Sequence, residues 1–215
     1  MNELTVSRPP AVRPRCRFRL LLIGASLGAL GLTALGAGAV FVFSTRPVPL
    51  AVSDSSGVAG FNFRVTGIPV PGVVPGVQVQ ASWNPASLNL SKATVQVDLR
   101  KLNTGIALRD RHAREFLGVD RHPVAVFRLA SIQGPSSLKA GQQAQALTAG
   151  VLTLNGIGHP LVSRSTLTLS RAGTALDVST HFDVVFSDYG ITIPGADPRT
   201  DVTVKFRLGA SPKSK

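Results

Sequence analysis

The chain has 215 residues, of which 44% are hydrophobic, and this length suits one domain of ordinary size together with an extra segment. Lysine and arginine outnumber aspartate and glutamate by 23 to 11, which gives a net charge of +12. The basic residues form no stripe interleaved with aromatic residues, so the composition argues against nucleic acid as a partner and is compatible with anionic lipid headgroups.

The N-terminal arm, residues 1–19, carries five arginines and one acid, and it is followed by 24 residues without charge, 20–43. As a helix this uncharged segment would span about 36 Å, against roughly 30 Å of hydrocarbon in a bilayer. The positive-inside rule keeps the arm cytoplasmic and sends the rest of the chain across the membrane. The arm also holds the only cysteine, Cys16, so no intrachain disulfide can form. Because Cys16 precedes the apolar segment, it does not fit the usual lipoprotein anchor.

A cleavable signal peptide is the alternative for the same segment. Its charged region would be Arg15–Arg19, its apolar region Leu20–Leu35 and its cleavage site Ala37–Ala39. The apolar run continues through Val40–Phe43, beyond that site, which favours an uncleaved anchor. Either interpretation places the remaining chain on the periplasmic or extracellular face. If the segment is cleaved, the remaining chain is a secreted protein.

Proline, serine and glycine in residues 44–57 predict a linker, followed by a barrel domain over 58–210 and a short tail over 211–215. In the barrel domain apolar and polar residues alternate, as in half-buried strands. Eight strands are expected, at Gly60–Thr66, Gly76–Trp83, Ala93–Leu99, Val124–Ser131, Gln145–Leu154, Leu161–Ser170, Ala175–Phe186 and Asp201–Leu208. A helix is expected at Ile106–Leu117, laid over a barrel mouth, and Asn155–Gly156 is expected to be a hairpin turn. The predicted fold is therefore all-β, an eight-stranded antiparallel barrel with one crossover helix.

Three sequence blocks carry a resemblance to a known family. They are Leu102–Leu129 with its TG and RDxH, Gly150–Leu161 (GVLTLNGIGHPL), and Phe186–Ile191 (FSDYGI). In order and spacing they resemble the YceI-like family over roughly residues 52–210. This resemblance implies a lipocalin-like barrel whose apolar interior takes a polyisoprenoid chain, such as a prenyl quinone.

The alternation predicts which side chains point inward and would contact such a lipid. The candidate ligand-binding residues are Phe61, Phe63, Val97, Leu99, Phe116, Leu117, Phe127, Leu152, Phe182, Val184, Phe186 and Phe206. The helix Ile106–Leu117 is a candidate lid, with Phe116 and Leu117 at the channel mouth. For any single one of these residues, simple filling of a core is the competing interpretation, and Trp83 is a core or rim residue that could gate a channel.

The expected function is non-catalytic binding of an isoprenoid lipid for carriage, storage or sequestration, with the membrane contacted through residues 20–43. No catalytic residue, metal site or cofactor other than the lipid is expected, and a homodimer is compatible with the sequence. One rival is an enzyme that modifies a lipid or ester with Asp110 and His112, where a carboxylate could orient a base. Another rival is a scaffold module whose barrel is filled by its own side chains.

Overall fold

The structure is a computed structural model that describes residues 50–53 and 57–209. The basic arm, the uncharged segment 20–43 and the C-terminal tail lie outside the described residues. In the part of the chain that is described, no helix combines the length and the apolar character needed to cross a membrane.

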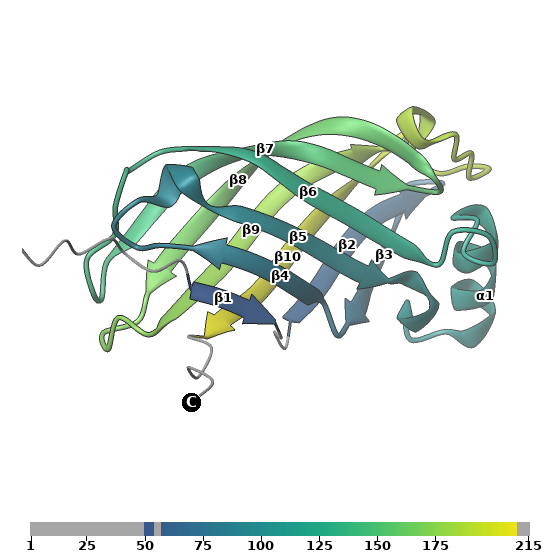
Figure 1. Cartoon of the computed structure of the whole chain (residues 1–215). Coiled ribbons are helices and arrows are strands. Elements are labelled where there is room, and N and C mark those ends of the chain that lie inside the picture. The colour runs from purple at the N-terminus through teal and green to yellow at the C-terminus, as the bar shows by residue number, and fades with distance from the viewer. Residues whose placement is uncertain (1–49, 54–56, 210–215) are drawn as a thin grey trace, which may run out of the picture. The chain divides into compact units, whose positions relative to one another are not determined.

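Ten antiparallel strands, one α-helix and three short 3-10 helices make up the regular structure of the described residues (Figure 1). The strands are β1 (Leu50–Ser53), β2 (Gly57–Val65), β3 (Ile68–Pro75), β4 (Gln78–Trp83), β5 (Lys92–Asp98), β6 (Val124–Gln133), β7 (Gln143–Leu154), β8 (Ile157–Leu169), β9 (Ala175–Val185) and β10 (Arg199–Gly209). The helices are η1 (Leu88–Leu90), η2 (Leu99–Lys101), α1 (Ala107–Phe116) and η3 (Phe186–Tyr189). Each of the eight predicted strands overlaps an observed one, and the predicted crossover helix is confirmed as α1.

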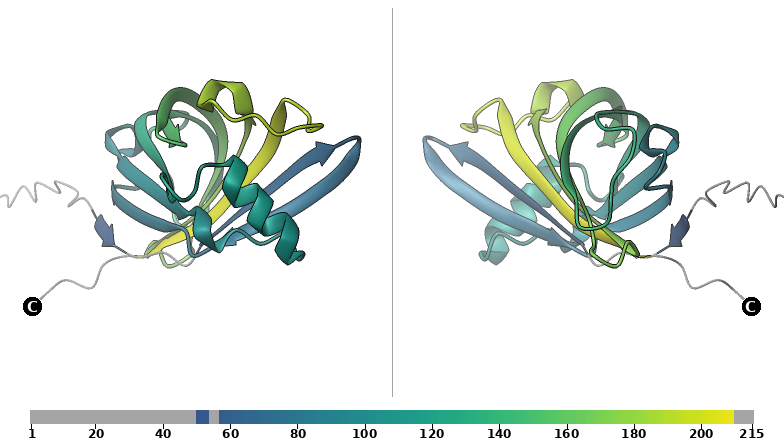
Figure 2. Two further views of the ribbon diagram at one scale, coloured as in Figure 1. Left: turned by 90° about the vertical axis from the view of Figure 1, so that its right-hand side faces the viewer. Right: turned by 90° about the vertical axis from the view of Figure 1, so that its left-hand side faces the viewer.

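The strands form a single sheet in the order β1-β4-β5-β6-β7-β8-β9-β10-β2-β3. Figure 2 shows this sheet curled about a common axis, with α1 at one end. Within the described residues the two edge strands, β1 and β3, are not hydrogen-bonded to each other, so the expected closed eight-stranded barrel is wrong in this respect. The domain is a half-barrel of ten strands. The two unexpected strands are those at the edges, and β1 occupies part of the segment predicted as a linker.

Prolines explain why β3 ends the sheet. Val73 exchanges two backbone hydrogen bonds with Asn103, on the side away from β2, with N···O distances of 2.9 Å in both directions. Residues at odd positions of β3 therefore turn their backbone groups outward. Pro69, Pro71 and Pro75 occupy odd positions, so their missing N–H groups remove no hydrogen bond to β2 and leave the outer edge poor in donors.

The hairpin between β7 and β8 is the one that the sequence predicted. Asn155 and Gly156 both have positive φ, 49° and 76°, as a two-residue turn with right-handed strand twist requires. The turn pairs Leu154 with Ile157 and sets the register of the two longest strands. Every second residue of these strands then faces the interior.

Two glycines make room for inward-facing aromatic rings. A Cβ atom on Gly72 in β3 would overlap the ring of Phe61 on the neighbouring strand β2. A Cβ atom on Gly150 in β7 would overlap the backbone carbonyl oxygen of Arg128 on β6 and would also lie 2.7 Å from Cζ of Phe127. Both glycines are therefore required by close packing, and close approach is a common reason for glycine inside a strand.

Candidate functional site

The inner face of the curled sheet lines two apolar cavities of similar size, about 130 Å³ and about 140 Å³. The first lies among β4 to β10, and the second lies among β2, β3, β5, β6, β7, β9, β10 and the helix α1. Five residues line both cavities: Val97, Ala125, Leu152, Phe182 and Val204. The two spaces therefore follow one another end to end and share a waist. Apolar cavities of roughly 150 Å³ are large enough to hold a small hydrocarbon ligand.

The end of the first cavity, opposite α1, is closed by two loops that bond to each other. Leu88 N–H donates to the carbonyl of Ser136 at 2.8 Å, and Leu138 N–H donates to the carbonyl of Pro85 at 2.7 Å. The side chains of Leu88 and Leu138 are buried in the hydrophobic core at this end. Solvent is thus kept from this end of the interior.

The end of the second cavity lies against α1, whose Ala113 contributes to the wall together with Leu117 just after the helix. The helix has no buried residue. Polar contacts hold it: the carboxylate of Asp110 accepts hydrogen bonds from the N–H and the hydroxyl of Thr104, both at 2.6 Å. Arg114 also donates to the carbonyl of Leu102 at 3.2 Å. Elements with little buried apolar surface open most easily, so α1 is the weakest part of the cavity wall.

The Asp110 carboxylate is used to hold α1 against Thr104. The hydrogen bond from the Thr104 hydroxyl holds the pKa of Asp110 below its ordinary value, aided by the Thr104 N–H and by the charges of Arg114 and Arg109. His112 lies on the exposed part of the helix. Among the described residues, the hydrogen bonds of Asp110 go to Thr104 and none goes to His112, so the carboxylate does not orient a base in the way that the enzyme hypothesis requires.

The structure places all but one of the predicted ligand-binding residues in the walls of the cavities. Three of them, Val97, Leu152 and Phe182, lie at the waist. Those that line only the first cavity are Phe127 and Phe206, and those that line only the second are Phe61, Phe63, Leu99, Leu117, Val184 and Phe186. The exception is Phe116, which lines neither cavity and is 39% exposed. The residues of this segment that do line the second cavity are Ala113 and Leu117, which lie four positions apart.

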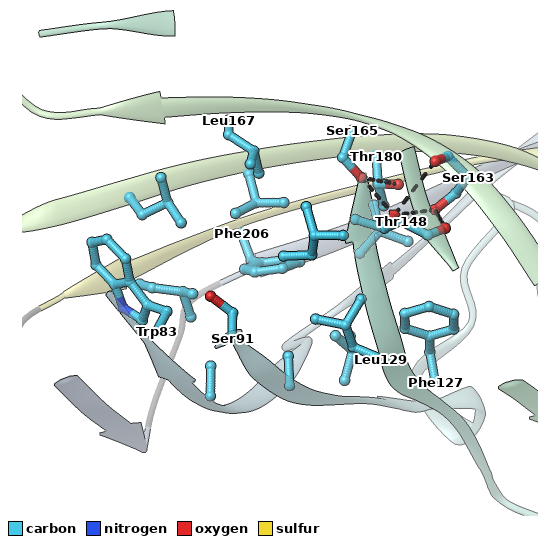
Figure 3. Close-up of a pocket in the computed structure, with 18 of the residues that line it drawn as sticks. Trp83, Ser91, Phe127, Leu129, Thr148, Ser163, Ser165, Leu167, Thr180 and Phe206 are labelled. Atoms are coloured by element: carbon cyan, nitrogen blue, oxygen red, sulfur yellow. Dashed lines mark hydrogen bonds between the residues drawn. The ribbon is translucent and has the colours of Figure 1, made fainter. Parts of the chain in front are cut away.

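Part of the wall is polar, which was not predicted from the sequence. The hydroxyls of four residues form one cluster on β7, β8 and β9 (Figure 3). Thr148 Oγ1 lies 2.6 Å from Ser163 Oγ and 2.9 Å from Ser165 Oγ, and Ser165 donates to Thr180 Oγ1 at 3.0 Å. Ser163 and Ser165 share the inward register of Leu161 and Leu167, so the period-2 pattern could have identified them.

The three sequence blocks noted above meet in space at Asn155. A Cβ atom on Gly118 would overlap the side-chain oxygen of Asn155, and one on Gly156 would lie 2.6 Å from the ring of His122. The Asn155 side-chain amide donates to the carbonyl of Tyr189 at 3.2 Å. The blocks therefore join the segment after α1, the β7–β8 turn and η3 at one end of the half-barrel. Their polar residues act in packing and hydrogen bonding there.

One group of potential metal ligands lies outside the cavities. His181, Asp183 and Asp201 present ligand atoms within 4.8 Å of one another on the exposed face of β9 and β10. Asp183 also lies 3.9 Å from Arg199, and His181 is 3.2 Å from the hydroxyl of Thr203. Exposed groups of this kind are common in proteins that bind no metal, and nothing else at this position indicates an ion.

Comparison with known proteins gives a consistent result. The family model of the YceI-like domain matches residues 51–210. A UPF0312 protein of Vibrio cholerae is 25% identical over 186 residues, which cover 80% of this chain and 93% of that protein. A UPF0312 protein of Ectopseudomonas mendocina is 34% identical over 83 residues, or 38% of this chain and 40% of that protein.

Two solved structures share the fold. BcnA of Burkholderia cenocepacia has a TM-score of 0.61 at 12% identity, covering 70% of this chain and 95% of its own. A polyisoprenoid binding domain from Saccharophagus degradans has a TM-score of 0.59 at 14% identity, covering 76% of this chain and 99% of its own. At such low identity the likeness establishes the fold.

Proposed function

The chain belongs to the YceI-like domain family, and from this membership together with the two joined apolar cavities we propose that its half-barrel binds a long isoprenoid lipid without altering it chemically. The observation that carries this proposal is the continuous apolar lining from Leu88 at the closed end to Leu117 beside α1. A filled barrel would leave no such space, so the cavities argue against a scaffold module. The domain from Saccharophagus degradans, which has the same fold, is described as polyisoprenoid-binding.

The energetics favour a hydrocarbon chain over water in this interior. Each methylene group transferred from water to an apolar cavity contributes about 0.8 kcal/mol, so ten such groups supply about 8 kcal/mol before the entropic cost of ordering the chain. Before that cost is subtracted, about 8 kcal/mol corresponds to a dissociation constant of about 1 μM, and each further methylene group of a longer prenyl tail helps to offset the cost without a charged anchor. A prenyl quinone or a polyprenyl lipid has such a tail.

The enzyme alternative has less support. The carboxylate of Asp110 is held by Thr104, and His112 is exposed on the helix rather than directed into the cavities. The lid function that we propose for α1 uses the same contacts: because polar bonds rather than buried side chains hold the helix, it can move aside to admit a lipid at the Leu117 end.

We further propose that the half-barrel acts on the outer side of the cytoplasmic membrane. The support is the sequence alone: an arginine-rich arm, residues 1–19, precedes 24 uncharged residues. An anchored lipid-binding domain at the periplasmic or extracellular face could take up, carry or shield a lipid that partitions into the bilayer.

The test is native mass spectrometry of the full-length chain purified in mild detergent, with organic extraction of the same sample. A prenyl lipid that co-purifies in stoichiometric amount, or that is taken up when prenyl quinone is added, is the expected result. A folded protein that arrives empty and takes up no added prenyl quinone would overturn the proposal.

A further inference from the structure

We propose that the closed end of the channel, at Trp83 and Ser91, is a subsite for an uncharged head group that accepts hydrogen bonds, such as the carbonyl of a quinone. This inference rests on the proposed lipid-binding function and specifies how the ligand lies within the site. The head group would be bound deep in the half-barrel, and the tail would extend through the waist toward α1.

The primary observation is a pair of polar atoms without partners. Trp83 ends β4 and is 3% exposed, and Ser91 immediately precedes β5. Both residues line the first cavity (Figure 3). Within the described part of the chain, Trp83 Nε1 and Ser91 Oγ are buried and make no hydrogen bond. Buried polar atoms are nearly always satisfied, and one that is not requires a specific explanation, such as a water, an ion or a ligand that completes its hydrogen bonding.

The chemistry of the two atoms defines the missing partner. The indole N–H of Trp83 can only donate, so it requires an acceptor. The Ser91 hydroxyl can donate one hydrogen bond and can accept others. A ligand oxygen that carries lone pairs, as a carbonyl oxygen does, can accept a hydrogen bond from either donor.

The hydroxyl cluster on β7 to β9 does not compete for this role, because its own protons are already used. Ser165 donates to Thr180 at 3.0 Å, and Thr180 donates to the carbonyl of Arg164 at 3.3 Å. Thr148 and Ser163 lie 2.6 Å apart, and each also has a backbone carbonyl of the other within 3.4 Å. The cluster is thus internally satisfied, whereas Trp83 and Ser91 are not.

The wall of the first cavity contains a single charged residue, which explains why the head group should be neutral. That residue, Lys92, is exposed and lies one position off the inward register of Ala93 and Val95. An ionised phosphate or carboxylate would lose its hydration at Trp83 and Ser91 and gain only two neutral donors in return, which is unfavourable in an apolar interior. A neutral carbonyl loses far less hydration and can still accept a hydrogen bond from these donors.

The experiment compares two ligands with the same decyl tail, a decyl-benzoquinone and decylbenzene, on the full-length chain in mild detergent. Equilibrium dialysis measures the binding of both. Trp83 is the only tryptophan of the chain, so quenching of its fluorescence reports whether the quinone ring lies near it. The variants are Ser91→Ala and Trp83→Phe, and the matched control is Ser131→Ala, at an exposed position on β6.

We expect the parent protein to prefer the quinone over decylbenzene and the quinone to quench Trp83. Ser91→Ala and Trp83→Phe should each weaken quinone binding about threefold to tenfold, the worth of one hydrogen bond, and leave decylbenzene binding unchanged. The control should behave as the parent. Ser91→Ala should melt at the same temperature as the parent or higher, because it removes a buried polar atom that has no partner.

Two outcomes would contradict the inference in different ways. If both ligands bind equally well and neither variant changes the ratio of their affinities, the head-group subsite is wrong while lipid binding stands. If neither ligand binds to the folded parent protein, the proposed function fails and the subsite with it.

Discussion

The waist between the two cavities offers a direct perturbation of lipid binding. Ala125 on β6 is 9% exposed, pairs in register with Val97 on β5, and lines both cavities. Replacing Ala125 by phenylalanine adds a ring where the two spaces join. The ring should confine a bound tail to one cavity and leave the half-barrel folded, because it enters existing space rather than a filled core.

The size of the effect follows from the hydrocarbon that is excluded. One prenyl unit of about five carbons, at about 0.8 kcal/mol per carbon, corresponds to about 4 kcal/mol and to an affinity loss on the order of 1000-fold. Overpacking of a filled core costs about 1–3 kcal/mol of stability, and the free volume beside Ala125 should keep the cost of Ala125→Phe at the lower end of that range.

The assay is equilibrium dialysis of a radiolabelled prenyl quinone against the full-length chain, with thermal unfolding as the test of folding. The matched control is Ala130→Phe, which adds the same ring to the same strand at an exposed position. It should bind the lipid as the parent does. If a folded Ala125→Phe protein binds the lipid with an affinity within about threefold of the control, the lipid tail does not pass through the waist.

Three further predictions concern stability and assembly. The pKa of Asp110 is lowered in the folded state, so the ionised carboxylate and its hydrogen bonds from Thr104 stabilise α1 at pH values above the ordinary pKa of the carboxyl group. This stabilisation is lost as the pH falls through the lowered pKa of the folded state. Asp110→Asn should therefore speed hydrogen exchange of α1 at pH 7 and not in acid; equal exchange at both pH values would argue against this role. Phe186 is 7% exposed and its ring makes an edge contact with Phe63. Phe186→Ala should therefore lower the free energy of unfolding, measured in urea, by about 3–5 kcal/mol, and a decrease of less than about 1 kcal/mol would contradict this expectation. Pro71→Thr should restore an outward-facing N–H on β3, and because an unpaired edge N–H can pair with another chain, self-association should increase. Light scattering measures the change, and an unchanged molecular mass would argue that proline does not protect this edge from pairing.

Much of the fold could be predicted because alternation is a local signal. Phe182 and Val184 lie two apart on β9, and a strand places them on one face whatever its partners are. The Asn155–Gly156 turn is equally local, since its positive φ angles suit these two residues. The family was predicted from the three sequence blocks and is confirmed by the domain match over residues 51–210.

The edge strands could not be predicted in the same way. Pro69, Pro71 and Pro75 indicate a loop, and they are compatible with a strand only if that strand lies at an edge with its odd residues outward. That condition depends on the whole sheet. The open edge between β1 and β3 is likewise a property of strand order, which alternation does not determine.

Alternation could predict which apolar residues of the strands face the cavities, whereas residues outside the strands carry no such signal. Phe116 lines neither cavity, and the residues of its segment that line the second one are Ala113 and Leu117. Trp83 and Ser91 could not be assigned, because a missing hydrogen-bond partner becomes visible only when every neighbour is in place.

The central claim, that a lipid tail lies inside the half-barrel, is tested most directly by photo-crosslinking. A prenyl quinone with a diazirine near the end of its tail would be bound to the full-length chain, irradiated and located by peptide mass spectrometry. The account predicts labels on inward-facing residues of the second cavity, such as Val184 and Phe186. Labels confined to the exposed apolar residues Leu147, Val151 and Val162 on β7 and β8 would place the lipid on the surface and contradict the account.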